Sequence, residues 1–408
     1  MRFNKLKASF DLPLQFWIIA LIVFINAVSF TIIIPIIYPY AKAFGLSDFE
    51  ASLLTTAYAV SQFLATPLLG RFSDFWGRKP LLVLSLVGTV LANLIASVAP
   101  AAWILFSARI LDGLTGGNTS IASAVISDMT KPADRAKAFG LLDAAFRLGF
   151  ITGPAISYVA QTLPTFPGVS PLGMSFFAGA AIALVATVLT IWLLPETLPH
   201  RAALKLSWQM FGLGKILQSV QRPRLGPVFL LTFFSGFTFT IFTFAFQPFF
   251  LNVLEQDAKA LAIVFVLVGV AGILTQVLAV GPLSARFNLA NLLCGALTAR
   301  SLTFLLIPLF PTPLGFSILA CLMGVANSFP LPLISSILST NSGDREQGEI
   351  LGINSAILSI SNAIGPAVAG ILVSLSYNAP FWLTAALTFL TAVFALRLKS
   401  LAGCSQAH

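Results

Sequence analysis

The sequence predicts an all-α membrane protein with twelve transmembrane helices arranged as two lobes of six. Hydrophobic residues make up 57% of the 408 residues and charged residues only 9%, and the mean hydropathy is +0.94. A helix needs about 20 apolar residues to cross a bilayer, so the chain has room for about a dozen crossings and little else. A soluble globular enzyme is excluded, because soluble domains carry about 25% charged residues.

Each predicted helix corresponds to an apolar run that is long enough to span the membrane. The runs cover residues 16–39, 52–70, 80–99, 102–126, 138–161, 173–195, 227–251, 259–281, 289–310, 314–338, 349–375 and 379–397. Nearly all loop lysines and arginines fall on the side of the two termini, and the opposite side holds only Lys42 and Lys259. Since cytoplasmic loops are enriched in these residues, both termini are predicted to be cytoplasmic.

A polar stretch divides the predicted helices into two sets of six. We therefore predict an N-terminal lobe over 1–195, a cytoplasmic linker over 196–226 and a C-terminal lobe over 227–408. The halves share sequence, because Ser61-Gln62-Phe63-Leu64-Ala65 resembles Thr275-Gln276-Val277-Leu278-Ala279 and Gly153-Pro154-Ala155 matches Gly365-Pro366-Ala367. Such parallel repeats predict a substrate site near the membrane midplane, between the lobes.

Three short motifs stand out at the ends and inside the predicted helices of the first half. The loop after the second helix combines a turn, an acid and a basic cluster in Gly70, Asp74, Gly77, Arg78 and Lys79. The fourth helix carries Arg109-Ile110-Leu111-Asp112-Gly113, and the fifth carries Gly149-Phe150-Ile151-Thr152-Gly153-Pro154. In these motifs, and over essentially its whole length, the chain resembles the major facilitator superfamily and, within it, the tetracycline and multidrug:proton antiporter branch.

The resemblance implies a gate on the cytoplasmic side. In it, Asp74 faces the start of the eleventh helix near Glu349, and Arg78 pairs with Asp128. The residues assigned to this gate are Gly70, Asp74, Gly77, Arg78, Lys79, Asp128, Arg135, Gly149, Gly153, Pro154 and Glu349. A Gly-Pro pair frees backbone groups and bends a membrane helix, which suits a hinge or a tight seam between helices.

Ionisable residues inside the predicted helices are costly, at roughly 2.5 to 3.5 kcal/mol each, and indicate function. Arg109 and Asp112 lie three residues apart, and Asp143 and Arg147 four apart, so each pair shares one helix face. We assign Asp112 as the proton-responsive acid, Asp143 as the second candidate and Arg109 as the partner that senses protonation. The alternative is a static buried ion network that fixes helix register. Arg300, in the ninth helix, has no acid at its depth.

Aromatic and amide side chains complete the predicted substrate site. Phe239, Phe242 and Phe246 recur at helical spacing in the seventh helix, where packing is the alternative role. In the first helix Asn26 replaces the acid that antiporters of this branch usually hold. The predicted substrate-binding set is Asn26, Gln62, Arg109, Asn118, Arg147, Phe239, Phe242, Phe246, Gln276, Asn327 and Asn354.

These features predict a secondary active transporter that works by alternating access, and not an enzyme. No G-x-x-x-x-G-K-[ST] or H-E-x-x-H pattern is present, and the cysteines lack metal-ligand spacing, so no cofactor or metal is expected. The leading hypothesis is proton-coupled efflux of amphipathic or apolar small molecules, by a monomer that contacts lipid, protons and substrate but no nucleic acid. The alternatives are an organic-anion transporter or uniporter that uses the intramembrane arginines, and a transporter-like receptor. The expected location is the plasma membrane, as a multi-pass protein of the bacterial inner membrane.

Overall fold

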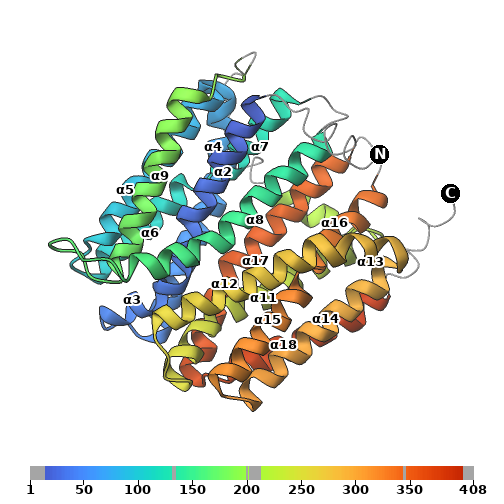
Figure 1. Ribbon diagram of the computed structural model, residues 1–408. Coiled ribbons are helices and arrows are strands. Elements are labelled where there is room, and N and C mark those ends of the chain that lie inside the picture. The colour runs from blue at the N-terminus through green and yellow to red at the C-terminus, as the bar shows by residue number, and fades with distance from the viewer. Residues whose placement is uncertain (1–13, 131–134, 199–200, 202–212, 343–345, 398–408) are drawn as a thin grey trace, which may run out of the picture.

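The computed structural model describes residues 14–130, 135–198, 201, 213–342 and 346–397, and all regular structure in this part of the chain is helical (Figure 1). Among these residues, eleven helices are long and apolar enough to cross a membrane. The helices of the first half are α2 (Leu14–Thr31), η1 (Ile34–Ile36), α3 (Ile37–Ala43), α4 (Asp48–Trp76), α5 (Arg78–Ser97), α6 (Ala102–Thr115), α7 (Asn118–Met129), α8 (Arg135–Ala160) and α9 (Gly173–Leu193).

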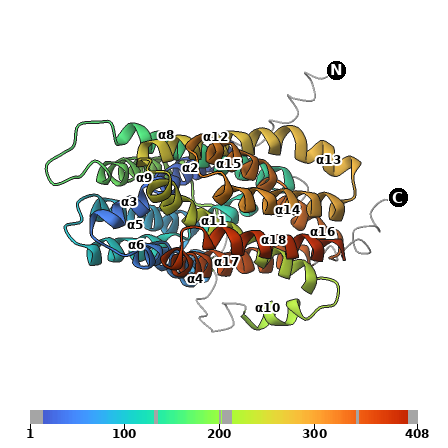
Figure 2. The same ribbon diagram turned by 90° about the horizontal axis from the view of Figure 1, so that it is seen from below.

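The second half begins with a short helix that lies outside the bundle, α10 (Leu213–Val220), as Figure 2 shows. Lys215 of α10 lies 2.7 Å from Glu349 at the start of α17. The other helices are α11 (Gly226–Pro248), η4 (Phe249–Val253), α12 (Ala258–Thr275), η5 (Gln276–Val280), α13 (Gly281–Arg286), α14 (Leu289–Leu306), η6 (Ile307–Leu309), α15 (Pro313–Asn327), α16 (Pro330–Thr340), α17 (Gln347–Leu375) and α18 (Ala379–Leu396).

The predicted helix over 102–126 is not continuous, which is why it is absent from the eleven long helices. It folds as α6 and α7, and the break falls at Gly116 and Gly117. The side-chain amide of Gln62 donates a hydrogen bond of 2.9 Å to the Gly116 carbonyl, so a backbone group freed by the break is satisfied inside the protein. A second break, at Ser328 and Phe329, separates α15 from α16. The two breaks are separated by the same number of residues as Gly153 and Gly365, so they occupy equivalent positions in the sequence repeat.

Two tight helix seams, one in each half, also correspond to each other. Thr31 of α2 donates a hydrogen bond of 3.0 Å to the Gly149 carbonyl of α8, and Thr240 of α11 donates one of 3.2 Å to the Ser361 carbonyl of α17. A Cβ atom on Gly153 would overlap the Thr31 hydroxyl. The duplication seen in the sequence is therefore repeated in the packing of α2 on α8 and of α11 on α17.

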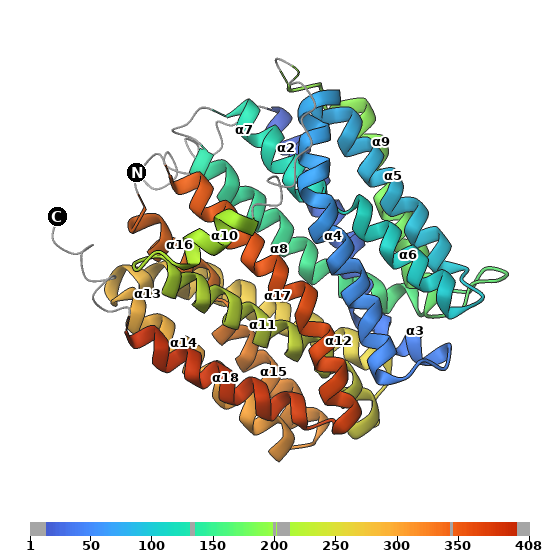
Figure 3. The same cartoon turned by 180° about the vertical axis from the view of Figure 1, so that it is seen from behind.

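The two ends of the helix bundle differ in how the halves are joined. We call the end where α2 begins and α18 finishes the terminal end, and the opposite end, which holds α3 and the turn from α17 to α18, the far end (Figures 1 and 3). One large hydrophobic cluster at the far end contains residues of both halves. Toward the terminal end each half has its own separate cluster. Among the described residues, the halves thus share a hydrophobic cluster only at the far end.

A cluster of polar side chains also joins the two halves at the far end. Asp48 of α4 accepts a hydrogen bond of 2.6 Å from the Tyr38 hydroxyl and one of 3.4 Å from the Tyr377 hydroxyl of the second half. Asn252 of η4 donates to the Tyr38 hydroxyl at 2.8 Å, and Gln247 accepts from the Tyr38 backbone N–H at 3.3 Å. Beside this cluster, α4 and α17 run against each other, as seen in Figure 3.

Candidate functional site

A cavity of about 360 Å³ lies between one helix of the first half and five helices of the second. Its walls come from α8, α11, α12, α15, α16 and α17, together with the first residue of η5. This volume is within the range of small-molecule sites, which are mostly apolar with a few convergent polar groups. The cavity adjoins the shared far-end cluster, since Phe242, Phe246 and Met323 belong to both.

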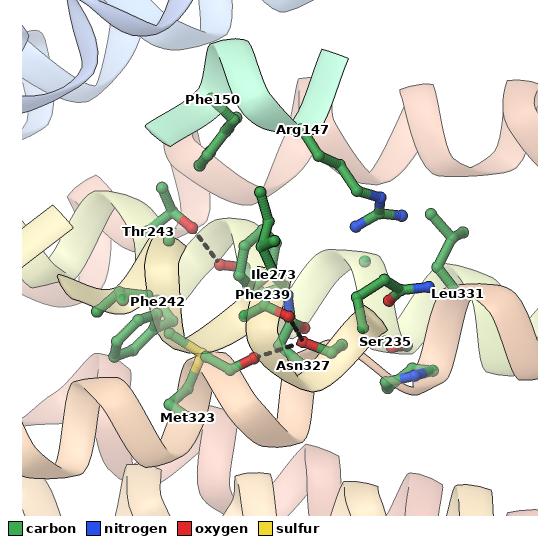
Figure 4. Close-up of a pocket in the computed structure, with 18 of the residues that line it drawn as sticks. Arg147, Phe150, Ser235, Phe239, Phe242, Thr243, Ile273, Met323, Asn327 and Leu331 are labelled. Atoms are coloured by element: carbon green, nitrogen blue, oxygen red, sulfur yellow. Dashed lines mark hydrogen bonds between the residues drawn. The ribbon is translucent and has the colours of Figure 1, made fainter. Parts of the chain in front are cut away.

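Aromatic side chains form the apolar part of the wall. Phe239, Phe242 and Phe246 of α11 all line the cavity. The ring of Phe246 packs against those of Phe265, at 4.8 Å, and Phe316, at 4.7 Å between centroids. Phe150 of α8 covers the opposite wall (Figure 4).

Polar groups gather on another part of the wall. The guanidinium of Arg147 points into the cavity, opposite Asn327 and Ser235, as Figure 4 shows. Gln276 also lines the cavity, and its amide oxygen is buried with no hydrogen-bond partner among the described residues. Arg147 is the only charged residue in the described lining, which contains no Asp or Glu. The described lining is therefore amphipathic and carries one cationic side chain.

Other predicted binding residues lie away from this cavity and contact neighbouring polar side chains or the backbone. Asn118 donates a hydrogen bond of 2.9 Å to Asn26, beside a second cavity of only about 10 Å³. Gln62 supports the break between α6 and α7, and Asn354 accepts from Thr232 at 2.5 Å. In this conformation these amides form hydrogen bonds with neighbouring protein groups and do not line the main cavity.

Arg109 and Asp112 form a buried ion pair within α6. Their atoms Nη1 and Oδ2 lie 2.9 Å apart, and both side chains are almost fully buried. The Arg109 guanidinium also lies over the Tyr58 ring of α4, at 4.5 Å from its centroid. The side chains of Asp143 and Arg135 lie outside the part of the structure that is described. The pair has the charge-against-burial balance that a proton-responsive site requires.

The loop motif of the first half builds a compact cluster at the terminal end. Arg78 lies 2.6 Å from Asp74 and 3.0 Å from Asp128. Gly77 has a φ of +119°, and a side chain there would overlap the Glu196 carboxylate. That carboxylate accepts hydrogen bonds from the backbone N–H groups of Arg78 and Lys79 at the start of α5, where the helix dipole favours a negative charge.

Two predicted gate residues have separate ionic partners, and one contact of this cluster was not predicted. Asp74 pairs with Arg78, and Glu349 pairs with Lys215. The described residues of the two halves form separate hydrophobic clusters toward the terminal end. Glu196 was not among the predicted gate residues. Its position in sequence, far from the loop in a polar stretch, gave no signal of its contact with α5.

The described residues contain no group of three or more His, Cys, Asp or Glu side chains that would hold a metal ion.

The other predicted gate residues lie at helix contacts or inside helices. Gly149 and Gly153 form the α2–α8 seam, and Pro154 lies inside α8. Lys79 donates a hydrogen bond of 2.7 Å to the Ile191 carbonyl near the end of α9. Gly70 has open space at its Cα and makes no close approach.

The sequence is similar to one protein family and to several of its members. The family model described as Major Facilitator Superfamily matches residues 19–227 and 228–402. Multidrug resistance protein 2 of Bacillus subtilis is 27% identical over 363 residues, covering 88% of each chain. Tetracycline resistance protein, class C, of Escherichia coli is 26% identical over 386 residues, covering 91% of this chain and 94% of the relative.

Solved structures share the fold at lower sequence identity. The human organic anion transporter MFSD10 superimposes with a TM-score of 0.70 and 21% identity, covering 94% of this chain and 100% of that one. The nucleoside transporter NupG gives a TM-score of 0.76 and 15% identity, covering 94% and 99%. At these identities the likeness shows the fold alone.

Proposed function

The chain belongs to the major facilitator superfamily and is a multi-pass protein of the bacterial inner membrane, and on this premise we propose that it exports amphipathic small molecules by alternating access. The observation that carries the proposal is the cavity of about 360 Å³, which is apolar and aromatic toward the far end and polar at Arg147, Gln276 and Asn327. The multidrug and tetracycline resistance proteins among its relatives support efflux.

The proposed topology has twelve crossings, with the terminal end in the cytoplasm. In it, α6 and α7 form one crossing that is interrupted at Gly116 and Gly117, as α15 and α16 form another. The lobes are residues 1–195 and 227–408, and the linker over 196–226 carries α10. The loop asymmetry of lysine and arginine supports this orientation. The shared core at the far end then represents the closed external side of an inward-facing state.

Proton coupling is assigned to the Arg109–Asp112 pair. Protonation of Asp112 would remove its attraction for Arg109 and leave a buried cation without its partner, which changes the relative free energy of the transporter's conformations. The pair contacts α4 through Tyr58, and α4 packs against α17 of the other half. A change at Asp112 therefore has a direct route to the contact between the lobes.

The second candidate is an organic-anion transporter or uniporter. The observation that favours it is the charge of the described cavity lining, which holds Arg147 and no carboxylate. It differs from the first candidate in one measurable respect, the absence of coupled proton movement.

The test is flux in liposomes that contain the purified protein and an internal pH dye. With an imposed pH gradient, we expect amphipathic aromatic probes to accumulate and protons to move in the opposite direction, both abolished by a protonophore. Each proton moved across 100 mV supplies ~2.3 kcal/mol, enough to concentrate a substrate roughly 50-fold. Substrate equilibration without proton movement would favour the uniporter, and the absence of any flux would contradict the transporter proposal.

A further inference from the structure

Arg300 of α14 is a fully buried cation whose described partners are all neutral. Its side chain is 1% exposed. It donates hydrogen bonds to the Asn327 amide oxygen at 2.9 Å, to the Thr238 hydroxyl at 3.1 Å and to the Ser235 carbonyl at 3.2 Å. Its Nε is buried with no described partner, and none of the described carboxylates forms an ion pair with it. A charge at this depth is costly and marks a functional group by default.

Two of the groups that Arg300 contacts, Asn327 and Ser235, also line the cavity. Arginine has only donors, so the Asn327 oxygen must face Arg300, and the amide N–H₂ of Asn327 is left as the group available to a ligand. Arg300 thus acts through Asn327 in two ways. It fixes the direction of the amide donor, and it adds positive potential behind it at low dielectric.

Helix register places Asn327 at the same depth as Arg147. Gly269 of α12 lies against Ile151 of α8, with a distance of 2.6 Å from a Cβ built on the glycine to the Ile151 Cγ1 atom. Because α8 and α12 run in opposite directions, Arg147, one turn before Ile151, is level with Ile273, one turn after Gly269. The neighbour of Asn327 is held at that depth too, since the Ser328 hydroxyl donates to the Gly272 carbonyl at 3.0 Å.

The aromatic residues lie on the far-end side of this polar layer. Phe239, Phe242 and Phe246 follow Ser235 along α11 by about 6, 10 and 16 Å, at 1.5 Å of rise per residue. The cavity therefore has an apolar closed end and a polar layer nearer the terminal end. A ligand that enters from the terminal end would place its apolar body among the rings and its head group at Arg147 and Asn327.

We propose that the ligand of this cavity is an amphipathic organic anion, bound with its acidic group in the layer of Arg147 and Asn327 and its apolar body toward the far end. Arg300 is the positioning residue that makes the layer select negative charge. This inference rests on the proposed transport function and specifies its substrate class and orientation. The amide oxygen of Gln276, which has no described partner, accepts a hydrogen bond from a donor on the same ligand.

The experiment compares three probes of one shape with different charge: naphthaleneacetate, naphthaleneacetamide and naphthylethylamine. Their binding to the purified full-length protein is measured by calorimetry. We expect the acetate to bind at least about tenfold more tightly than the amide, from a Coulomb attraction of a few kcal/mol at an effective dielectric near 20. Arg300→Met should lower this ratio several-fold, leaving only the part that Arg147 supplies, while the affinity for the amide changes less than about twofold. Arg300→Lys should keep most of the ratio.

The matched control is Arg286→Met, which removes an exposed arginine at the end of α13 and should leave the ratio unchanged. If Arg300→Met does not fold, Asn327→Asp provides the second test. It places a carboxylate beside Arg300, and we expect the acetate to lose affinity and the amine to gain it.

Two outcomes would overturn the inference: equal binding of acetate and amide by the unaltered protein, or an equal loss of both in Arg300→Met. The latter would mean that Arg300 only supports the fold. These outcomes are separable from failure of the proposed function, because liposome flux of the three probes is measured in parallel. If all three probes are transported equally well, the proposed transport function is retained and the proposed anion site is rejected.

Discussion

Asp112→Asn is expected to abolish proton-driven accumulation of substrate, so that the ratio of internal to external concentration falls to about 1, because a carrier without its titrating group has no coupling to the gradient. Substrate exchange at equal concentrations should persist, since Asp112 does not line the cavity. The measurement is accumulation and exchange in the same liposomes. The side-chain amide keeps the shape of the carboxyl group, carries no charge and cannot take up a proton.

Asp257→Asn is the matched control for this substitution. Asp257 accepts a hydrogen bond from the Ala260 N–H at the start of α12, and Asn serves equally well at such a position. Accumulation should therefore be normal. If Asp112→Asn folds and accumulates substrate like the unaltered protein, coupling lies elsewhere, and Asp143 becomes the next residue to replace.

Gly149→Val is expected to destabilise the protein by about 3 kcal/mol or more, because the seam between α2 and α8 has no room for a side chain. A Cβ atom on Gly149 would lie 2.6 Å from the Ala27 Cβ atom and 2.8 Å from the Phe24 carbonyl oxygen. The second contact is with backbone, which cannot move without separating the helices. We expect a large fall in the yield of monodisperse protein and in its thermal unfolding temperature in detergent.

Gly140→Val tests whether the effect comes from the seam or from the helix. Gly140 lies on the same helix, and a Cβ atom there meets nothing within 4 Å. Its replacement should be neutral or slightly stabilising, since glycine is less favourable than alanine inside a helix by about 0.5 to 1 kcal/mol and valine recovers part of that difference. Equal losses of stability in the two variants would show that the seam is not the cause.

Much of the fold was predictable because the membrane requires long apolar helices, and hydropathy reports them directly. The break between α6 and α7 was not, since Gly116 and Gly117 lie inside an otherwise apolar run and their effect depends on Gln62 of another helix. Gln62 and Gln276 occupy equivalent positions in the sequence repeat but have different roles in the structure. Gln62 supports that break, whereas its counterpart Gln276 faces the cavity.

Site residues on a single helix could be predicted from their spacing, whereas contacts between side chains of different helices could not. The spacing of Phe239, Phe242 and Phe246 was sufficient to place them on one wall. The partners of Arg300 come from α15, the next long helix, and from α11, which is 62 residues away. They are neutral, so no acidic residue in the sequence indicates them. The direction in which Asn26 and Asn118 face depends on mutual hydrogen bonding across helices, which composition does not reveal.

The most direct test of the account is to block the cavity chemically. Thr243, on the cavity wall, is replaced by cysteine in a protein without the native cysteines, and a charged thiol reagent is applied from the side of the terminal end, which we propose to be cytoplasmic. Ser284→Cys, on α13 outside the cavity lining, is the control. We expect labelling of Thr243→Cys to stop substrate flux and bound substrate to protect it, while labelled Ser284→Cys stays active. Complete labelling of Thr243→Cys with undiminished flux would show that substrate does not pass through this cavity.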